Sequence, residues 1–572
     1  MLTDSRRRKR VIYLLIILAC SYIFLFHNLG TYSLKEPDEG RYAEIPREMV
    51  EQGDYVVPHL NYVRYFEKPP LLYWVEALSY KVLGVSEWSF RFPNALAALL
   101  CVLIMYLFAS RWFGDEVGLL SSLMLLTSFG FFAISHVVTI DMLFSFLLFG
   151  SLLCFYQYYR EKRPLFLYLF FAALALAVLA KGPVALILMF VTIVLFLWSE
   201  KKMLFLKDML SVKALLLFCL IVVPWFVIVC LREKEFFQFF FVDQHILRFL
   251  TTRHKRSGPL YYFFPVLFGG LFPWSIFIPR AVARFWRTKE MRLFFIWSLV
   301  VFVFFSLSGS KLPPYILPIF PAVSVIVAYL FERQWHDRVR PGREIIAYVA
   351  FFSFVALGGF AYLSGILDRY LAGLPEVASI SRDIRWLILS VTVASFAALS
   401  VMLFRKMRTY RSLFYLLGAF SFVLCTGVML HPNVVDKFNT TKELAREIIT
   451  ISGPAPIVIN YGSFDETLPF YLKRRTYIAE YLGELKMGSK YPDAKDYFLD
   501  KDNFIRLFRS DQPVLVVLKK KRLSRLNVAG IEGGTFIARH DGRYLIANKT
   551  AAILSSGTVN GRIGSLIQEE GR

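Results

Sequence analysis

Residues able to do chemistry are concentrated in a few short polar motifs that interrupt a mostly apolar sequence. An ionisable residue at the centre of a membrane helix costs about 2.5–3.5 kcal/mol, so such residues tend to face a cavity or to pair with one another. We therefore expect the motifs to line a shared polar cavity. They are Asp38-Glu39-Gly40-Arg41, Phe66-Glu67-Lys68-Pro69-Pro70, Thr139-Ile140-Asp141, Ala180-Lys181-Gly182-Pro183, Asp243-Gln244-His245-Ile246-Leu247-Arg248 and Ser310-Lys311-Leu312-Pro313-Pro314-Tyr315.

The charges of these motifs suit an anionic substrate carried by a lipid. Preorganised Lys and Arg side chains stabilise the negative charge on a departing phosphate, most strongly where water is excluded. Asp38 and Asp141 are candidates for the carboxylate that orients or deprotonates an acceptor hydroxyl. A lipid-linked phosphate therefore fits this set of residues. The cations are Arg41, Lys68, Lys181, Arg248, Arg253 and Lys311.

Each of these residues also has a purely structural interpretation, which the sequence leaves open. Asp38 is of a type favoured at a helix N-terminus, and the same holds for Asp141. Lys68 fits an interfacial lysine whose ammonium group reaches the lipid headgroups. Lys181 fits a plain turn flanked by Gly and Pro. His245 taken alone is more typical of a hydrogen-bonded interfacial histidine than of a metal ligand.

Apolar helices must position the motifs, because 56% of the residues are hydrophobic. Apolar runs of about 17–25 residues, which allow a helix to cross about 30 Å of hydrocarbon, recur about 13 times. This pattern predicts a polytopic α-helical membrane protein. The expected spans are 11–29, 93–112, 118–135, 139–158, 164–180, 182–198, 214–231, 260–279, 293–309, 313–331, 345–366, 386–404 and 412–430.

Basic residues predict the orientation of these spans. The run of Arg and Lys at 6–10 precedes the first span, and no small-residue cleavage site follows it. We therefore expect a retained first helix with a cytoplasmic N-terminus. An odd number of crossings then places the polar motifs and everything after residue 431 on the outside. The links expected in the cytoplasm are rich in Lys and Arg, as such links usually are; they are 160–163, 199–213, 280–292, 333–343 and 405–408.

The net charge of +23 does not indicate nucleic acid. Much of the charge belongs to the cytoplasmic links, where orientation and anionic lipid explain it. All six cysteines fall inside apolar spans without a CxxC spacing, so no disulfide or thiol chemistry is expected.

The chain is expected to divide into three parts. Residues 1–431 form the membrane domain, including an external loop at 30–92 with two interfacial helices, near 38–50 and after Pro70. Residues 432–550 form an external α/β domain. Its expected helices lie near 464–474 and 502–509. Its expected strands are 456–460, 477–479, 513–518, 535–539 and 544–548, the last two forming a hairpin that turns at Asp541-Gly542. Residues 551–572 form a polar, loosely ordered tail.

Several ordered motifs resemble those of a known family. They are Glu36-Pro37-Asp38-Glu39-Gly40-Arg41-Tyr42-Ala43-Glu44, Val57-Pro58-His59-Leu60-Asn61, Tyr65-Phe66-Glu67-Lys68-Pro69-Pro70-Leu71-Leu72-Tyr73-Trp74, Arg91-Phe92-Pro93 and Lys311-Leu312-Pro313-Pro314-Tyr315. Over residues 30–330 the chain resembles the ArnT-like aminoarabinose transferases and the wider family of polyprenyl-phosphate-sugar-dependent glycosyltransferases with the GT-C fold. The resemblance implies a helical membrane bundle that carries a C-terminal periplasmic α/β domain.

The resemblance also implies roles for individual residues. Asp38 corresponds to the catalytic aspartate and Asp141 to the second acidic residue. The residues implied to bind the donor and its phosphate are Arg41, Tyr42, Tyr65, Lys68, Lys181, Arg248, Lys311 and Tyr315. Glu67 and His245 match a metal site of the family. Because two protein ligands are fewer than the three usual for catalytic zinc, any divalent metal would be accessory and none is required.

The implied reaction is transfer of a sugar, with inversion, from undecaprenyl phosphate to an acceptor at the outer leaflet of a bacterial inner membrane. The leading expectation is 4-amino-4-deoxy-L-arabinose moving to lipid A. A relative that moves another sugar to lipopolysaccharide core, another glycan or protein is the nearest alternative. A lipid or polysaccharide transporter is an alternative of another class, although its polar residues should continue to both faces. An inactive assembly subunit leaves the buried charges without a role.

Overall fold

The computed structural model describes residues 2–247, 258–366, 384–404, 409–431, 439–451, 455–523, 534–554 and 561–562. The chain folds into two compact units. The first comprises residues Met1–Leu29 and Arg91–Val434, and the second comprises Gly30–Phe90 and Val435–Arg572. The loop at 30–90 therefore groups by contact with the C-terminal residues rather than with the membrane helices. The expected domain boundaries stay a prediction.

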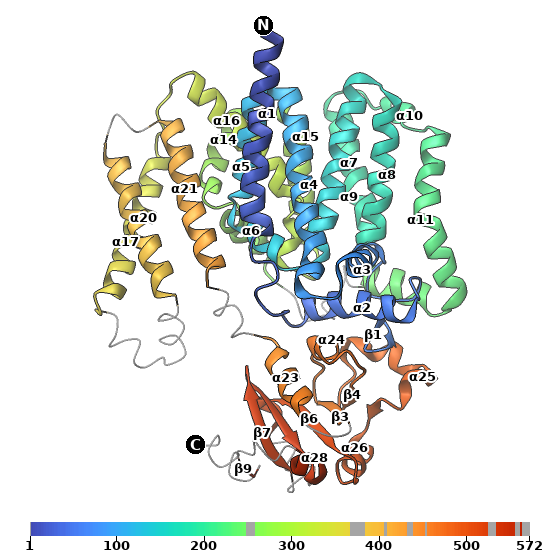
Figure 1. Ribbon diagram of the computed structural model, residues 1–572. Helices are drawn as coiled ribbons and strands as arrows, with labels where there is room; N and C mark the ends of the chain where they lie inside the picture. The colour runs from blue at the N-terminus through green and yellow to red at the C-terminus, as the bar shows by residue number, and fades with distance from the viewer. Residues whose placement is uncertain are drawn as a thin grey trace. The chain divides into compact units, whose positions relative to one another are not determined.

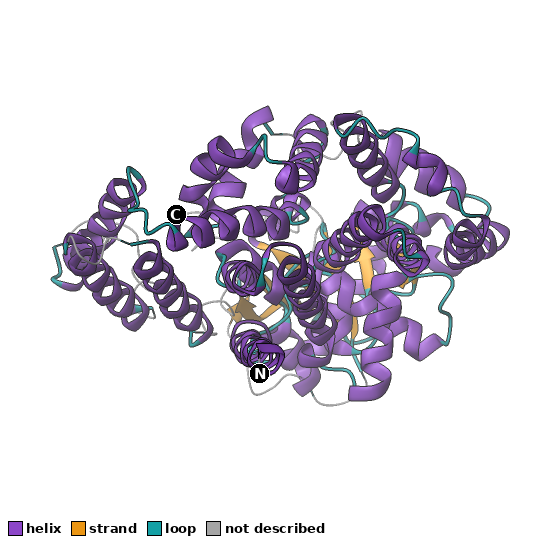
Figure 2. Ribbon diagram, turned by 90° about the horizontal axis from the view of Figure 1, so that it is seen from above, coloured by secondary structure: helices purple, strands orange, loops and turns teal. Residues whose placement is uncertain are grey.

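The first unit is helical, and its long helices run roughly parallel in Figure 1, while Figure 2 looks along them. Among the described residues, nine helices are long and apolar enough to cross a membrane. They are α1 with η1 (Leu2–Ser21, Tyr22–Phe26), α4 (Glu87–Phe113), α7 (Ile140–Glu161), α8 (Pro164–Lys181), α11 (Val212–Arg232), η5 with α15 (Lys289–Met291, Arg292–Leu307), α17 (Glu344–Leu363), α20 (Arg385–Leu403) and α21 (Tyr410–Met429).

The remaining expected spans coincide with bent or shorter helices. The helices α5 (Asp115–Leu126) and α6 (Phe129–His136) form a pair bent by 60°. A second pair, residues 260–270 and 274–285, is bent by 113°. Its first arm consists of η3 (Leu260–Tyr262) and α13 (Phe263–Gly270), and its second arm consists of η4 (Trp274–Phe277) and α14 (Ile278–Phe285). The last two are α9 (Val184–Ser199) and α16 (Ile319–His336). Each expected span thus coincides with one of these helices or bent pairs, while the count of 13 crossings stays a prediction.

The two bent pairs meet at their breaks. The indole N–H of Trp274 donates to Thr127 Oγ1 at 3.0 Å, and the backbone N–H of Phe129 donates to the carbonyl of Phe272 at 3.1 Å. Backbone groups freed by a break must find partners inside protein when no water is present. Each break thus satisfies polar groups of the other, which explains how irregular backbone is tolerated at this depth.

The loop of the second unit contains two helices and a hairpin. Helix α2 (Asp38–Gln52) packs against α3 (Leu71–Leu83), and the hairpin of β1 (His59–Leu60) and β2 (Val63–Arg64) lies between them in the chain. The hairpin turns through Asn61 and Tyr62, both with positive φ. Both helices agree with the positions expected from the sequence.

The C-terminal part of this unit is a seven-stranded mixed sheet with the order β5-β4-β3-β6-β8-β7-β9. The strands β3 to β6 are parallel neighbours, and the hairpin of β7 and β8 adds antiparallel strands. The expected strands and hairpin are confirmed. The bounds are β3 (Ile457–Tyr461), β4 (Tyr477–Ala479), β5 (Phe498–Leu499), β6 (Val514–Lys519), β7 (Thr535–His540), β8 (Arg543–Ala547) and β9 (Gly561–Arg562).

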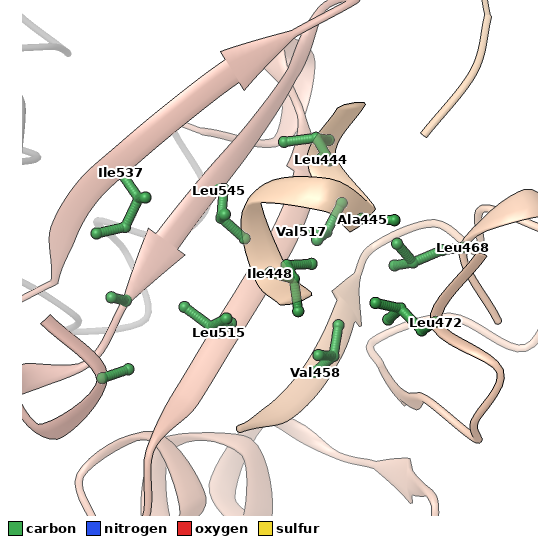
Figure 3. Packing of buried hydrophobic residues seen from close by; sticks show 12 residues of the cluster. Leu444, Ala445, Ile448, Val458, Leu468, Leu472, Leu515, Val517, Ile537 and Leu545 are labelled. Carbon is green, nitrogen blue, oxygen red and sulfur yellow. The ribbon is translucent and has the colours of Figure 1, made fainter. Parts of the chain in front are cut away.

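Both faces of this sheet are covered, as the apolar strand β6 requires. Its residues alternate between the faces, with Leu515 and Val517 on one side and Val514, Val516 and Leu518 on the other. On the first face, α23 (Lys442–Thr450) and α24 (Thr467–Leu472) contribute Leu444, Ile448, Leu468 and Leu472 to the core shown in Figure 3. Helix α26 (Lys501–Phe508) covers the other face with Phe504 and Phe508.

The expectation of a loosely ordered tail is wrong for its beginning. Helix α28 (Lys549–Leu554) extends past residue 551, and residues 561–562 form β9 against β7. The physical reason is burial, because Ala551 is fully buried in the core of Figure 3 and anchors the helix to the sheet.

Helix α2 is held closely against α24 within the second unit. The Glu36 carboxylate accepts the backbone N–H groups of Glu466 at 2.9 Å and Thr467 at 2.7 Å, which caps the N-terminus of α24. A Cβ on Gly40 would lie 2.6 Å from the Thr467 nitrogen, so this position admits only glycine without a shift of backbone. Two residues of the Glu36–Arg41 motif are thus explained by packing.

Candidate active site

Helix α2 presents the first cluster of predicted site residues. Asp38 and Arg41 lie one turn apart at its start, and Arg41 Nη1 donates to Asp38 Oδ1 at 2.9 Å. The same guanidinium donates from Nε to Glu484 Oε1 at 3.0 Å and from Nη2 to Glu484 Oε2 at 2.5 Å. The Arg41 side chain is 8% exposed and that of Asp38 is 41% exposed. Asp38 is therefore the accessible end of a buried charge network.

The surroundings of Arg41 keep it charged. Burial alone would lower the pKa of Arg41, but the carboxylates of Glu484, Glu466 and Asp38 and the nearby Tyr65 outweigh burial and hold that pKa well above its ordinary value. Burial raises the pKa of Glu484, and the neighbouring Glu67 adds to this effect while Arg41 opposes it. The cluster thus holds one permanent cation among several carboxylates.

Three tyrosines lie in or next to this cluster. The Tyr65 ring centre lies 5.9 Å from the guanidinium carbon of Arg41, and the rings of Tyr42 and Tyr73 are 6.1 Å apart. The hydroxyls of Tyr65 and Tyr73 are buried and have no hydrogen-bond partner among the residues that the structure describes. A buried donor without a partner is costly, so these hydroxyls are available for a polar ligand.

Glu67 and Lys68 precede α3 and are both half-buried. The charge of Glu67 raises the pKa of both Tyr65 and Glu484, so Glu67 belongs to the same cluster. The structure therefore brings together Asp38, Arg41, Tyr42, Tyr65 and Glu67, with Lys68 adjacent in the chain.

The second cluster lies in the first unit, where the start of α7 meets the end of α8. Asp141 and Lys181 form a buried ion pair, and the Lys181 ammonium lies 4.3 Å from the ring centre of Tyr315. Lys311 is also buried and donates to the carbonyl of Ser308 at 2.7 Å. Asp141 is thus paired with a cation rather than serving as a simple cap of α7. The expectation of one cavity shared by all motifs stays a prediction.

Three predicted site residues lie outside this description. Arg248 falls among the residues that are not described, as does Arg253, and of His245 only the backbone in η2 (Gln238–Leu247) is described. A catalytic zinc site takes three protein ligands. Among the described side chains, no group of three or more His, Cys, Asp or Glu residues is placed to hold a metal ion. The metal site of Glu67 and His245 therefore stays a prediction.

Comparisons with known proteins bear on these clusters. Residues 10–240 match the family model of the dolichyl-phosphate-mannose-protein mannosyltransferases, and residues 444–548 match the model of the aminoarabinose transferase C-terminal domain. An undecaprenyl phosphate-alpha-4-amino-4-deoxy-L-arabinose arabinosyl transferase of Proteus mirabilis is 27% identical over 542 residues, which are 92% of this chain and 96% of the relative. The corresponding protein of Yersinia enterocolitica is 28% identical over 82% of this chain and 86% of its own length.

A solved structure extends the similarity to the whole fold. The crystal structure of ArnT from Cupriavidus metallidurans bound to undecaprenyl phosphate matches with a TM-score of 0.80 at 26% identity, and it covers 94% of this chain and 98% of that one. The chain is thus similar over nearly its whole length to the ArnT-like GT-C glycosyltransferases.

The similarity to the ArnT-like proteins confirms several expectations. The fold is a GT-C membrane bundle with a C-terminal sheet domain, and the chain is a multi-pass protein of the inner membrane. It is a glycosyltransferase, so the transporter and the inactive subunit are no longer alternatives.

Two residues near Arg41 were missed by the sequence analysis. Glu484 lies in η8 (Gly483–Lys486), more than 400 residues further along the chain, and no motif around it indicates an ion pair with Arg41. Tyr73 stands within the motif that begins at Tyr65, but its spacing also fits a buried face of α3. Only the folded ArnT-like chain places them beside the guanidinium.

A buried carboxyl on helix α3 predicts how stability depends on pH. Glu76 on α3 is fully buried, and neither of its oxygens has a partner among the described residues. Burial, and then the charge of Glu39, raise the pKa of Glu76 well above its ordinary value. The folded chain therefore binds this proton more tightly than the unfolded chain, and the free energy of unfolding falls as pH rises through the interval between the two pKa values.

We expect Glu76→Gln to remove this part of the pH dependence, which amounts to at most about 1.4 kcal/mol per pH unit. Melting temperatures measured between about pH 5 and about pH 8 should show a growing advantage of the variant. Glu51→Gln is the control, because hydrogen bonds from Tyr62 and Arg47 outweigh burial and lower the pKa of Glu51. Glu51 is therefore charged in both the folded and the unfolded chain across this range, and the melting temperature of this variant should differ from that of wild type by a constant amount. If the melting temperatures of wild type and Glu76→Gln changed in parallel across this pH range, the raised pKa of Glu76 would be contradicted.

Proposed function

We propose that the chain is an inverting glycosyltransferase that moves 4-amino-4-deoxy-L-arabinose from undecaprenyl phosphate to lipid A at the periplasmic face of the inner membrane. The observation that carries the proposal is the buried Arg41 guanidinium paired with the accessible carboxylate of Asp38. Further support comes from the relatives named for transfer of this sugar and from the solved relative bound to undecaprenyl phosphate.

In this proposal an oxygen of the acceptor attacks C1 of the sugar from the face opposite the leaving group. The bond between C1 and the phosphate oxygen breaks, and its electron pair remains on undecaprenyl phosphate. Arg41 and Lys68 stabilise the negative charge that develops there, which is most effective in a site that excludes water. Because a lipid A phosphate is already anionic, Asp38 chiefly positions it. A hydroxyl acceptor would need Asp38 as a general base.

We assign the second cluster to the recognition of substrate. Asp141 and Lys181 are ionisable and buried in a membrane helix bundle, where such residues usually serve substrates. The ring of Tyr315 lies 4.3 Å from the Lys181 ammonium, and Lys311 is a second buried cation close to Tyr315 in the chain. A neutral replacement of both members of the pair, described in the Discussion, separates this role from a structural one.

A transfer assay with purified protein tests the proposed substrates. We expect the full chain in lipid vesicles to transfer aminoarabinose from its undecaprenyl phosphate donor to lipid A, with the product identified by mass spectrometry. The match to a protein mannosyltransferase model favours a second candidate, transfer of another sugar to a glycan or protein. Reaction only with an undecaprenyl phosphate hexose would establish that alternative and contradict aminoarabinose transfer.

We propose that the transfer step requires no metal ion. Arg41 and Lys68 already supply positive charge for the phosphate, and Glu67 and His245 are fewer ligands than catalytic zinc takes. Dialysis of the purified protein against EDTA should therefore leave the transfer rate within about twofold of the untreated value, as expected when no ion carries a step. A rate that falls on dialysis and returns with added zinc would contradict this.

We propose a cytoplasmic N-terminus and a periplasmic C-terminal domain. Support comes from the run of basic residues at 6–10 and from the basic links that follow even-numbered spans. Alkaline phosphatase fused after residue 554 should be active in cells, and the same reporter fused at the N-terminus should be inactive. The reverse pattern would contradict the orientation.

A further inference from the structure

Glu484 is the main partner of the arginine that we assign to the phosphate. It lies in η8 of the C-terminal sheet domain, whereas Arg41 lies in the external loop. The Glu484 carboxylate accepts hydrogen bonds from both Nε and Nη2 of the guanidinium. The Glu484 side chain is 16% exposed and that of Arg41 is 8% exposed. A bidentate pair of this kind fixes the plane of the guanidinium as well as its position.

The hydrogen bonds of this pair leave two N–H donors of Arg41 unused among the described residues. A guanidinium has five N–H donors. Hydrogen bonds to described residues engage one donor on Nε, one on Nη1 and one on Nη2. Each of the two terminal nitrogens therefore keeps one N–H, and such N–H groups suit the oxygens of a phosphate. Glu484 holds one edge of Arg41 without using all of its donors.

The C-terminal domain also fixes the backbone beneath Arg41. Glu36 caps helix α24, and Gly40 packs against the backbone of Thr467. Within the second unit, three residues of one short motif are thus held by the sheet domain: Glu36 through its carboxylate, Gly40 through close packing and Arg41 through Glu484. The position of the arginine depends on the domain that supplies these contacts.

We propose that Glu484 is a positioning residue of the transfer reaction, through which the C-terminal domain orients Arg41 toward the phosphate of the lipid carrier. The inference rests on the proposed function, because it presumes that Arg41 binds that phosphate. It gives the C-terminal domain a part in the reaction that its sheet and cores do not explain. Glu484 itself does not contact the substrate.

The test compares four forms of the full chain: wild type, Glu484→Gln, Arg41→Ala and the double variant. Undecaprenyl phosphate alone is the binding probe, and KM and kcat are measured in the transfer assay. Loss of a residue that orients a binding group typically costs about 10- to 100-fold in affinity or activity. We expect Glu484→Gln to weaken binding of undecaprenyl phosphate and to lower kcat/KM by about this factor.

The double variant distinguishes an effect through Arg41 from general damage. If Glu484 acts through Arg41, adding Glu484→Gln to Arg41→Ala should lower affinity by less than about twofold further. Asp493→Asn is the matched control, because Asp493 forms an exposed ion pair with Arg64 and so links the same two segments away from the cluster. This control should bind and react as wild type does.

Glu484→Asp, which keeps the charge, replaces Glu484→Gln if the latter does not fold, and should be impaired less than Arg41→Ala.

Three results would overturn the inference. They are wild-type affinity in Glu484→Gln, losses that add independently in the double variant, and tighter binding of undecaprenyl phosphate in Glu484→Gln. The last result would mean that Glu484 competes with the phosphate. Failure of the proposed function looks different, since wild type and Arg41→Ala would then bind undecaprenyl phosphate equally weakly.

Discussion

Replacement of Arg41 by alanine is expected to lower the rate of sugar transfer about 100- to 1,000-fold, the usual cost of removing one preorganised group that stabilises developing charge. The departing phosphate gains negative charge in a buried site, where no water can substitute for the guanidinium. Lys68→Ala and Asp38→Asn should each cause a loss of the same order, since they remove the second cation and the carboxylate that positions the acceptor. The rates are measured with purified variants reconstituted in lipid vesicles.

Folding must be separated from chemistry in these variants. Arg41→Ala leaves the Glu484 carboxylate buried beside other acids, so its melting temperature should fall, and the additional change Glu484→Gln should restore part of it. Lys81→Ala removes an exposed lysine of α3 and should leave transfer unchanged. Full activity in any one of the three site variants would remove that residue from the mechanism.

The second large effect is expected at the buried pair of Asp141 and Lys181. Lys181→Ala leaves a carboxylate without its partner in the membrane unit, and breaking a buried pair in this way costs about 3–5 kcal/mol. We therefore expect a protein that is poorly stable and transfers little or no sugar. Thermal unfolding and transfer rate are both measured on the purified variant.

A neutral version of the pair separates stability from function. Asp141→Asn combined with Lys181→Met carries no buried charge, so its melting temperature should return close to that of wild type. If the pair recognises substrate, transfer should remain about 100-fold below wild type. Wild-type transfer in the stable double variant would show that the pair is structural only.

Much of the fold follows from patterns that are local in the chain. Apolar runs located every membrane helix because burial in lipid requires about 20 apolar residues in a row. Alternating or continuous apolar strands located β3, β4, β6, β7 and β8. The number of crossings was harder to predict. The pair of α5 and α6 and the pair at 260–285 each bend at a break, and these breaks depend on contacts between the two pairs. The start of the tail was misjudged because its burial depends on a distant core.

The candidate site was predicted in part for the same reason. Asp38 and Arg41 are one helical turn apart, so their pairing is visible in the sequence. The pairing of Asp141 with Lys181 joins the ends of two neighbouring helices and needed the fold. The contact of Glu484 with Arg41 could not be predicted from the sequence, because a single glutamate in a polar stretch gives no indication of a partner more than 400 residues away.

The proposal that this chain places aminoarabinose on lipid A can be tested in cells. Mass spectrometry of lipid A and surface glycans from cells with and without the gene tests it most directly. We predict that lipid A carries aminoarabinose only when the gene is present, and that a gene encoding Asp38→Asn does not restore it. Unchanged lipid A together with an altered glycan or glycoprotein would contradict the claim and favour transfer to another acceptor.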